Sequence, residues 1–419
     1  MWGLPPLEGQ GGGRGHAVPA VRRMPAVAGR GVAQGFPQAR EPLSRRQGEV
    51  MLSPKAFFRR SLAAASLCLV AGCIPAGPQR PVPTAPPITV QSGPPVRPVR
   101  PPAPVPVAPV RAQPPARLLN AVQALGGRFK GDVGISVRDI DEGWTVAWAG
   151  DTPRPQQSVS KLWVAIAVMD AVDHKRLSLS DAVTVRRSDL TLFHQPIRAQ
   201  VGADGYRTTV GDLLRCAMTR SDNTCNDVLL WRVGGPDKIR RMLADKGVEG
   251  VTFGPGERVL QARTAGLEWK PEWAGGWGFL KARAAMSYEA RSKAMARYLA
   301  APYDGASANG VTLGLSLLAQ GKLLSRASTD SLIATMLASR TGPLRLKSGL
   351  KPGWTLAHKT GTGQDLGSMT TGYNDVGVLR APDGHRYAVA VMIAQTREPI
   401  PVRMRMMGDV TRAIIATRD

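Results

Sequence analysis

The order of hydrophobic patterns along the chain is the feature that most restricts the possible folds. Apolar residues alternate with small or polar ones over 133–137 and 145–149, which is typical of strands with one buried face. From 177 to 337 the spacing is mostly helical, and alternation returns over 354–395. Strands at both ends of a helical block predict an α+β fold with two lobes. One lobe is an antiparallel sheet flanked by helices, the other is all helical, and a cleft lies between them.

The chain ahead of this pattern lacks the composition of a folded core. Residues 1–50 are rich in Gly, Pro and Arg without periodicity, and residues 73–117 are dominated by Pro, which favours an extended tether. Residues 51–72 place basic side chains before a short apolar run and small residues, as secretory signals do. We expect 1–50 to be a disordered, mis-assigned upstream extension, 51–72 a signal peptide, 73–117 a tether and 118–419 the folded domain.

The end of the signal segment resembles a bacterial lipoprotein box. It reads Val70-Ala71-Gly72-Cys73, and Cys73 would then be the lipidated first residue of the mature protein. An ordinary signal peptide with a chance cysteine is the alternative. We expect an exported, periplasmic protein that is held on the membrane by lipid at Cys73, with Met51 as the true start.

Charge and the other cysteines add to this interpretation. The formal net charge is +24, and half of it lies ahead of Leu118. A basic surface favours anionic lipid headgroups or cell-wall polymer, or it is only a solvated surface. An exported protein does not meet nucleic acid in normal use, so we expect no such partner. Cys216 and Cys225 can pair in an oxidising compartment or remain buried thiols, and the sequence leaves both open.

A serine at the head of an apolar run is the first candidate for chemistry. Residues 162–169 are all apolar and free of Gly and Pro, which predicts a helix buried on most sides. Ser158 would lie at its N-terminus, and Lys161 would share a face with Ser158. Serine is a poor nucleophile without a group that takes its proton. A lysine one turn away, in a site that lowers its pKa, can do so.

Two further triplets follow in a meaningful order. Ser221-Asp222-Asn223 lies about sixty residues beyond Ser158, and Lys359-Thr360-Gly361 lies near the C-terminus. Ser-x-x-Lys, Ser-Asp-Asn and Lys-Thr-Gly in this order resemble the signature of penicillin-recognising serine enzymes. From about Leu118 to its end the chain therefore resembles class A serine β-lactamases and their relatives among penicillin-binding proteins. The likeness extends to Thr341-Gly342-Pro343-Leu344, Pro352-Gly353-Trp354 and Asn374-Asp375-Val376-Gly377-Val378.

The resemblance implies a role for each motif residue. Ser158 would be the nucleophile, Lys161 a candidate base, and Ser221 a proton relay to the leaving nitrogen. The backbone N–H groups of Ser158 and Thr362 would form the oxyanion hole. Asp222 would be structural. The expected substrate-binding residues from these motifs are Asn223, Lys359, Thr360, Gly361 and Thr362.

A fourth motif bears on the hydrolysis of an acyl-enzyme. Residues 257–261 read Glu-Arg-Val-Leu-Gln, which resembles the Glu-x-x-Leu-Asn of class A enzymes. The resemblance makes Glu257 a catalytic base for water, with Gln261 helping to hold that water. Pro255 replaces the usual arginine, and the loop from 257 to 286 is longer than usual. Glu268 and Glu272 are rival carboxylates in that loop, and Glu257 could instead be a solvated loop residue.

These features together predict a serine β-lactamase that hydrolyses β-lactam antibiotics and gives antibiotic resistance. A DD-peptidase or peptidoglycan hydrolase acting on peptidoglycan peptides is one alternative, and a penicillin-binding sensor that does not hydrolyse its adduct is another. We expect no cofactor and no metal, since His358 has no ligand spacing. Phe193 would flank the cleft or lie in the core.

Overall fold

The computed structural model describes residues 113–418, which belong to one unit of the chain. Its central layer is an antiparallel sheet made of strands from both ends of that region. Across the sheet the order is β2 (Thr145–Trp148), β1 (Gly131–Asp139), β11 (Arg386–Thr396), β10 (Tyr373–Arg380) and β7 (Thr355–Thr362). The short strand β9 (Met369–Thr370) pairs with β11 and with β8 (Asp365–Leu366).

Side chains that alternate along β11 pack on opposite faces of the sheet. Val389 and Val391 belong to the apolar core between the sheet and the first and last helices of the described region. Ala388 and Ala390 belong to the core shared with the helical lobe. Both faces are therefore buried, which explains the almost continuous apolar sequence of this strand. Helices α1 (Ala116–Arg128) and α11 (Ile400–Ile415) pack on one face of the sheet and α9 (Ala308–Ala319) packs on the other. Helix α10 (Arg326–Leu337) packs on β7.

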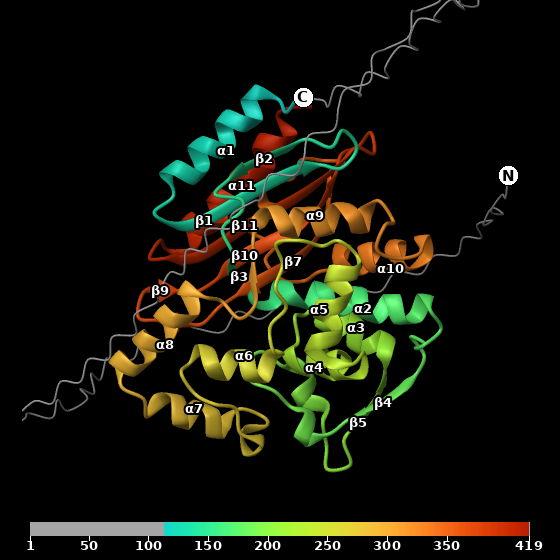
Figure 1. The fold of residues 1–419 in the computed structure, drawn as a ribbon, viewed down its shortest axis with the longest axis vertical. Helices are drawn as coiled ribbons and strands as arrows, with labels where there is room; N and C mark the ends of the chain where they lie inside the picture. Colours follow the sequence, from blue (N-terminus) through green and yellow to red (C-terminus); the bar gives the residue numbers. More distant parts are fainter. Residues whose placement is uncertain (1–112, 419) are drawn as a thin grey trace, which may run out of the picture. The chain divides into compact units, whose positions relative to one another are not determined.

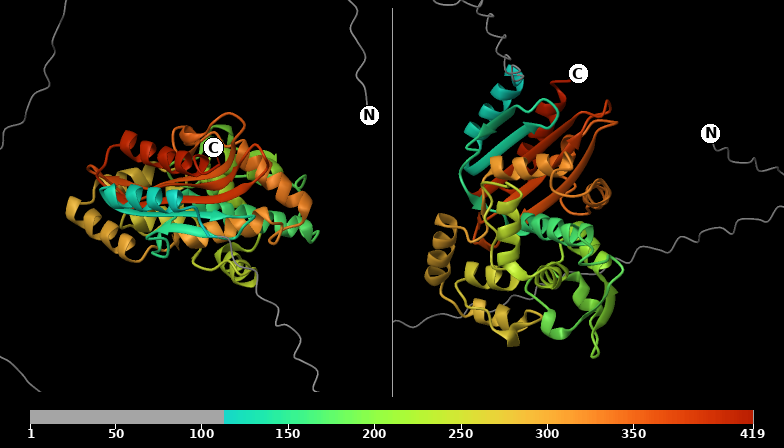
Figure 2. Two further views of the ribbon diagram at one scale, coloured as in Figure 1. Left: turned by 90° about the horizontal axis from the view of Figure 1, so that it is seen from above. Right: turned by 45° about the vertical axis from the view of Figure 1, so that its right-hand side comes forward.

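The helical lobe is built around α2 (Lys161–Asp173), in which ten of thirteen residues are buried. Figure 1 and the right view of Figure 2 show this lobe beyond one side of the sheet. Thr209 caps α3, its side chain accepting the Asp212 N–H at 3.1 Å, as the sequence predicts. The helices and hairpin of this region are α3 (Val210–Thr219), α4 (Asn223–Arg232), α5 (Gly235–Asp245), α10 (Arg326–Leu337), β4 (Ala182–Val185) and β5 (Tyr206–Thr209).

The segment from 257 to 286 is not the loop that the sequence suggests. It contains α6 (Glu257–Thr264) and α7 (Trp277–Ala284) before α8 (Tyr288–Ala300) begins. A small core of its own holds it in place, in which Trp273 and Phe279 pack edge to face with ring centroids 5.8 Å apart. This cluster explains why the long connection folds: its aromatic residues pack against each other and against Leu192 of the helical lobe.

The α+β, two-lobed prediction is confirmed, and most predicted elements lie within a few residues of the observed ones. The first helix begins at Ala116, two residues before the predicted start of the domain at Leu118. Three short strand pairs were not predicted, namely β3 (Arg154–Pro155) with β6 (Gly305–Ala306), β8 with β9, and β4 with β5, which lies in a stretch predicted to be mostly helical. The predicted extension, signal peptide and nearly all of the tether lie outside the described residues. Within 113–418, none of the helices is long and apolar enough to cross a membrane.

Candidate active site

Ser158 lies on a single 3₁₀ turn, Gln157–Ser160, that leads directly into α2. Lys161, the first residue of α2, is 1% exposed, and its Nζ donates to Ser158 Oγ at 2.9 Å. The same Nζ donates to Asn223 Oδ1 at 2.9 Å and forms an ion pair with Glu257. The predicted Ser158–Lys161 contact is therefore present, and one ammonium group joins residues from three of the sequence motifs.

The second motif forms the sharp connection between α3 and α4. Ser221 has a left-handed backbone, with φ of 60°, which is uncommon for a residue with a side chain. Asp222 caps α4 by accepting the Cys225 N–H at 2.9 Å, and its other oxygen accepts the Ile197 N–H at 2.7 Å. Burial raises the pKa of Asp222. Asp222 is thus structural, as predicted, and it orients Ser221 and Asn223 on either side of it.

The third motif lies on β7, whose buried face points toward Ser221. Lys359 is fully buried, and its Nζ donates to Ser221 Oγ and to the Thr360 carbonyl, both at 2.8 Å. Burial, together with the nearby charge of Lys161, lowers the pKa of Lys359 well below its ordinary value. Gly361 packs so closely on the Gln156 carbonyl that a Cβ there would lie 2.3 Å from that oxygen. Only glycine leaves room for this approach between β7 and the turn of the nucleophile.

Glu257 is buried at the N-terminus of α6, so the alternative of a solvated loop glutamate is wrong. It is 2% exposed, and Gln261 Nε2 donates to its Oε2 at 3.2 Å, as their spacing on a helix allows. Asp227 accepts the Glu257 N–H at 2.9 Å and so anchors the start of α6. Burial and the neighbouring Glu257 raise the pKa of Asp227 to about 6. These contacts set Glu257 firmly beside Lys161.

The rival carboxylates lie elsewhere. The Glu268 side chain is 77% exposed and lies near Arg263, and Glu272 is exposed as well. Neither lines the cleft that contains Ser158.

A cleft of about 640 Å³ opens beside Ser158 and collects most of the predicted residues. Three predicted residues are buried just behind the cleft surface, and each contacts a residue that lines it. Lys161 contacts Ser158, Glu257 contacts Gln261, and Lys359 contacts Ser221. Phe193 lines the cleft and is 39% exposed, so its position there, rather than in the core, is confirmed. The predicted site residues on the wall are Ser158, Ser221, Asn223, Gln261, Thr360 and Thr362.

The sequence interpretation missed a cation in this cleft. Arg345 is buried, donates to Thr362 Oγ1 at 2.7 Å and to the Gly361 carbonyl at 3.0 Å, and lies 3.7 Å from the centre of the Tyr373 ring. Thr341 Oγ1 lies 2.7 Å from Thr360 Oγ1 beside it. The family-like stretch Thr341–Leu344 directly precedes this arginine in the sequence, but no motif marks Arg345 itself. Its position beside two threonines suits a substrate carboxylate.

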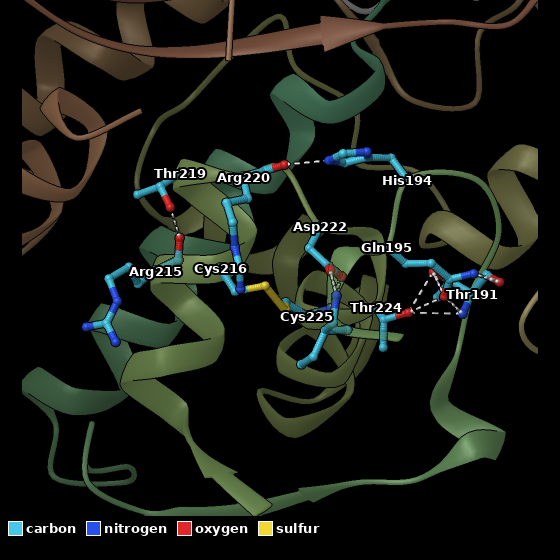
Figure 3. Close-up of a disulfide and its surroundings, with 11 residues drawn as sticks. Thr191, His194, Gln195, Arg215, Cys216, Thr219, Arg220, Asp222, Thr224 and Cys225 are labelled. Carbon is cyan, nitrogen blue, oxygen red and sulfur yellow. Dashed lines mark hydrogen bonds between the residues drawn. A yellow bond between two sulfur atoms is a disulfide. The ribbon is translucent and has the colours of Figure 1, made fainter. Parts of the chain in front are cut away.

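A disulfide joins Cys216 on α3 to Cys225 on α4, with the two Cα atoms 6.1 Å apart. Figure 3 shows it beside the connection that contains Asp222. His194 supports the same connection: its Nε2 lies 2.8 Å from the Arg220 carbonyl, and its own carbonyl accepts the Asn223 N–H. The disulfide is thus the alternative that the structure adopts, and it encloses Ser221.

One group of possible metal ligands lies apart from the catalytic motifs. Asp139, Glu142 and His385 come together at the end of β1. His385 Nε2 bonds Asp139 at 2.7 Å, and the Trp144 indole donates to Glu142 at 2.8 Å. These contacts account for the cluster as a hydrogen-bonded structural group, and they give no reason to assign an ion to it.

In this cleft Lys161 contacts the hydroxyl of Ser158, and Lys359 contacts the hydroxyl of Ser221. This arrangement in an α+β fold is that of a serine hydrolase that works through an acyl-enzyme. The model of the β-lactamase enzyme family matches residues 117–417. The chain belongs to that family, and the match covers the whole of its described core.

Individual relatives agree with this assignment. The chain is 24% identical to β-lactamase VEB-1 of Pseudomonas aeruginosa over 71% of this chain and 87% of that protein. It is 29% identical to the extended-spectrum β-lactamase PER-1 of the same species, over 58% of this chain and 68% of that protein. A solved β-lactamase from Chitinophaga pinensis superposes with a TM-score of 0.59 at 26% identity, covering 72% of this chain and 99% of the other.

Proposed function

We propose that this protein hydrolyses β-lactam antibiotics in two steps, acylation of Ser158 and hydrolysis of the resulting ester. The observation that carries the proposal is the set of contacts of Lys161 Nζ, which reaches Ser158, Asn223 and Glu257 at once. One buried ammonium thus connects the nucleophile to the carboxylate that the second step needs.

In acylation, Ser158 Oγ attacks the lactam carbonyl and the ring C–N bond breaks. The serine proton reaches Glu257, either through Lys161, whose ammonium passes one of its protons to Glu257 as it takes up the proton of Ser158, or without Lys161 as a carrier. The developing oxyanion is bound by the backbone N–H groups of Ser158 and Thr362. Ser221 passes its hydroxyl proton to the leaving nitrogen and takes up a proton from Lys359, whose Nζ donates to Ser221 Oγ.

Substrate orientation follows from charge. The carboxylate that β-lactams carry lies against Thr360, Thr362 and Arg345, since these form a hydroxyl-lined cationic end of the cleft. Asn223 binds the amide of the acylamino group. Its Nδ2 donates to the Leu192 carbonyl and its Oδ1 accepts from Lys161, so its side chain is held in one orientation.

In deacylation, Glu257 takes a proton from a water molecule that attacks the ester. Gln261 shares hydrogen bonds with Glu257 and with Gln157, the residue before the nucleophile, both at 3.2 Å. It therefore lies where it can hold this water, in place of the shorter asparagine of the family motif. Its Nε2 is engaged in both contacts, and this observation favours a slow deacylation as the second candidate, that of a penicillin-binding protein that acts on peptidoglycan peptides or as a sensor.

The test is nitrocefin turnover by the purified protein, with mass spectrometry of any adduct. Hydrolysis over many turnovers supports the proposal, whereas a lasting adduct after one turnover supports the second candidate. Ser158→Ala should abolish labelling by a fluorescent penicillin while the thermal unfolding midpoint stays near that of the wild type. Labelling that persists in this variant would exclude Ser158 as the nucleophile.

The place where the protein acts belongs to the proposal as well. Export followed by lipid attachment at Cys73 would put the enzyme in the periplasm, in the path of antibiotics that approach the cell wall. The lipobox-like Val70-Ala71-Gly72-Cys73 supports this, and the Pro-rich 73–117 would separate the enzyme from the membrane.

A further inference from the structure

The long segment between α6 and α8 carries a helix to the mouth of the cleft. Phe279 of α7 packs edge to face on Phe193, with ring centroids 5.4 Å apart, and on Trp273 from the other side. Because Phe193 lines the cleft, this packing fixes α7 beside the entrance. Figure 1 shows α7 and α8 as a pair at the side of the helical lobe, with α8 toward β9.

Arg283, in the last turn of α7, reaches from this segment into the cleft wall. Its Nε donates to Gln364 Oε1 at 3.1 Å, and its Nη2 donates to the Asp365 carbonyl at 3.4 Å. Its guanidinium carbon lies 5.8 Å from the centre of the Phe193 ring. The guanidinium therefore bridges the two walls of the cleft, from Phe193 on one to the residues after β7 on the other.

The charge of this group is not balanced by an ion pair. The partners of Arg283 are an amide oxygen, a carbonyl and an aromatic ring, and Arg291 of α8 donates to the same Asp365 carbonyl at 3.4 Å. Within 113–418 neither arginine has a carboxylate within 4 Å. Burial and the charge of Arg291 lower the pKa of Arg283, and Asp365 only partly opposes this. An anion arriving in the cleft would meet the Arg283 guanidinium, which no carboxylate of the described residues already pairs.

The position of Arg283 decides which part of a substrate it can meet. Arg345, Thr360 and Thr362 form the cationic end that takes the ring carboxylate. Arg283 lies at a different part of the cleft, where it donates to Gln364 Oε1. Gln364 Nε2 in turn donates to the Gln261 carbonyl at 2.8 Å, so Arg283 is on the side of the cleft that holds Gln261. In a β-lactam the acylamino substituent points away from the ring carboxylate. With its amide on Asn223, its outer part extends toward Phe193, Gln364 and Arg283.

We propose that Arg283 is a specificity-determining residue, which favours β-lactams whose acylamino side chain bears a negative charge, such as an α-carboxylate. The inference rests on the proposed function and deepens it. The guanidinium is half-buried and held by neutral partners, so a carboxylate gains a charge-assisted hydrogen bond without displacing an existing ion pair.

A matched pair of substrates tests this directly. Benzylpenicillin and α-carboxybenzylpenicillin differ only by the carboxylate on the side chain. The measurement is the second-order rate constant of acylation for each, taken on the full chain, because this constant exists even if deacylation is slow. In the wild type we expect the ratio of the carboxylated to the plain substrate to fall as ionic strength rises.

Three variants separate charge from structure. Arg283→Gln should lower the ratio about tenfold, the loss of one charge-assisted contact. Arg283→Lys should keep most of it, because the positive charge remains. Arg291→Gln is the matched control: Arg291 shares the Asp365 carbonyl but does not line the cleft, so the ratio should change by less than about twofold.

The outcomes are distinct. If Arg283→Gln slows both substrates equally, Arg283 only ties α7 to the strand side and the inference is wrong; an unchanged ratio overturns it as well. Benzylpenicillin serves as the internal control for folding, since a misfolded variant would lose both rates. Failure of the wild type to be acylated by either penicillin would instead overturn the proposed function, and the inference with it.

Discussion

At the scale of the residue, the buried pair of Lys161 and Glu257 dominates the site. Their side chains are 0% and 2% exposed, so each charge depends on the other for compensation. Removal of one partner from such a pair typically costs about 3–5 kcal/mol, because the other charge is left buried and unpaired. A variant that tests chemistry here must therefore keep the shape and the hydrogen bond while it removes the basicity.

Glu257→Gln meets this condition. The amide oxygen can still accept from Lys161, but glutamine cannot take a proton from water at neutral pH. Acylation should remain measurable while the acyl-enzyme accumulates. Steady-state turnover of nitrocefin should fall by at least about 100-fold, the lower range for general-base catalysis. The readout is a burst close to one equivalent of enzyme, with the adduct mass on the intact protein.

Glu268→Gln and Glu272→Gln are the matched controls, since both residues are exposed on the same long segment. Each should turn over nitrocefin within about twofold of the wild type, as surface substitutions generally have little effect. A stalled Glu268→Gln beside an active Glu257→Gln would show that the base had been assigned to the wrong carboxylate.

At the scale of the element, the connection between α3 and α4 stands out. Ser221 keeps a left-handed backbone, which typically costs a residue with a side chain about 1 kcal/mol or more. The Cys216–Cys225 disulfide, the Asp222 cap and the His194 contact surround it and restrict its alternatives. Ser221 is also the residue whose hydroxyl accepts a hydrogen bond from Lys359. Its rigid surroundings therefore keep this hydroxyl in place at the cleft.

We expect the double variant Cys216→Ala/Cys225→Ala to lose about 2–3 kcal/mol in its free energy of unfolding, from the chain entropy that a loop of this length restores to the unfolded state. Acylation should slow as well, because Ser221 is less restrained. Urea unfolding and the acylation rate of benzylpenicillin measure the two effects.

A reducing agent supplies the control for this variant. It should lower the unfolding midpoint of the wild type toward that of the double variant and leave the double variant unchanged. Equal midpoints for oxidised and reduced wild type would mean that the disulfide does not stabilise the fold.

At the scale of the whole molecule, the site depends on the sheet and the helical lobe together. Ser158, Lys161 and Glu257 come from the helical lobe and Lys359 and its neighbours from β7, so neither part alone contains the reaction chemistry. Arg345 links the two strands of this edge, since it donates to the Gly361 carbonyl on β7 and, at 2.6 Å, to the Asn374 carbonyl on β10.

The anchoring of the chain is tested on the full sequence. Expressed from Met51 in a Gram-negative host, the protein should fractionate with membranes, and Cys73→Ala should release it to the soluble periplasmic fraction. Stable attachment needs the several acyl chains of a mature lipoprotein, since one chain binds only marginally. Cys68→Ala, within the apolar run of the signal, is the matched control and should stay with the membranes. A wild type found wholly in the soluble fraction would contradict the lipid anchor.

The sequence by itself determined those features that depend on local spacing. Ser158 and Lys161 lie three residues apart at the head of a helix, so their contact follows from helix geometry, and Glu257 meets Gln261 for the same reason. The alternation along β7, β10 and β11 and the apolar run of α2 were sufficient for the α+β class, because burial on a face has a fixed period in each kind of element.

Only the tertiary structure decided the features that depend on contacts between distant segments. Glu257 looked like a loop residue because nothing near it in sequence shows that Asp227 caps its helix or that Lys161 neutralises its charge. Arg345 and Arg283 carry no local motif, since their roles come from threonine, glutamine and carbonyl partners that other elements supply. The pairing of Cys216 with Cys225 was likewise open until α3 and α4 were packed side by side, because a disulfide depends on distance in space and not on spacing in the chain.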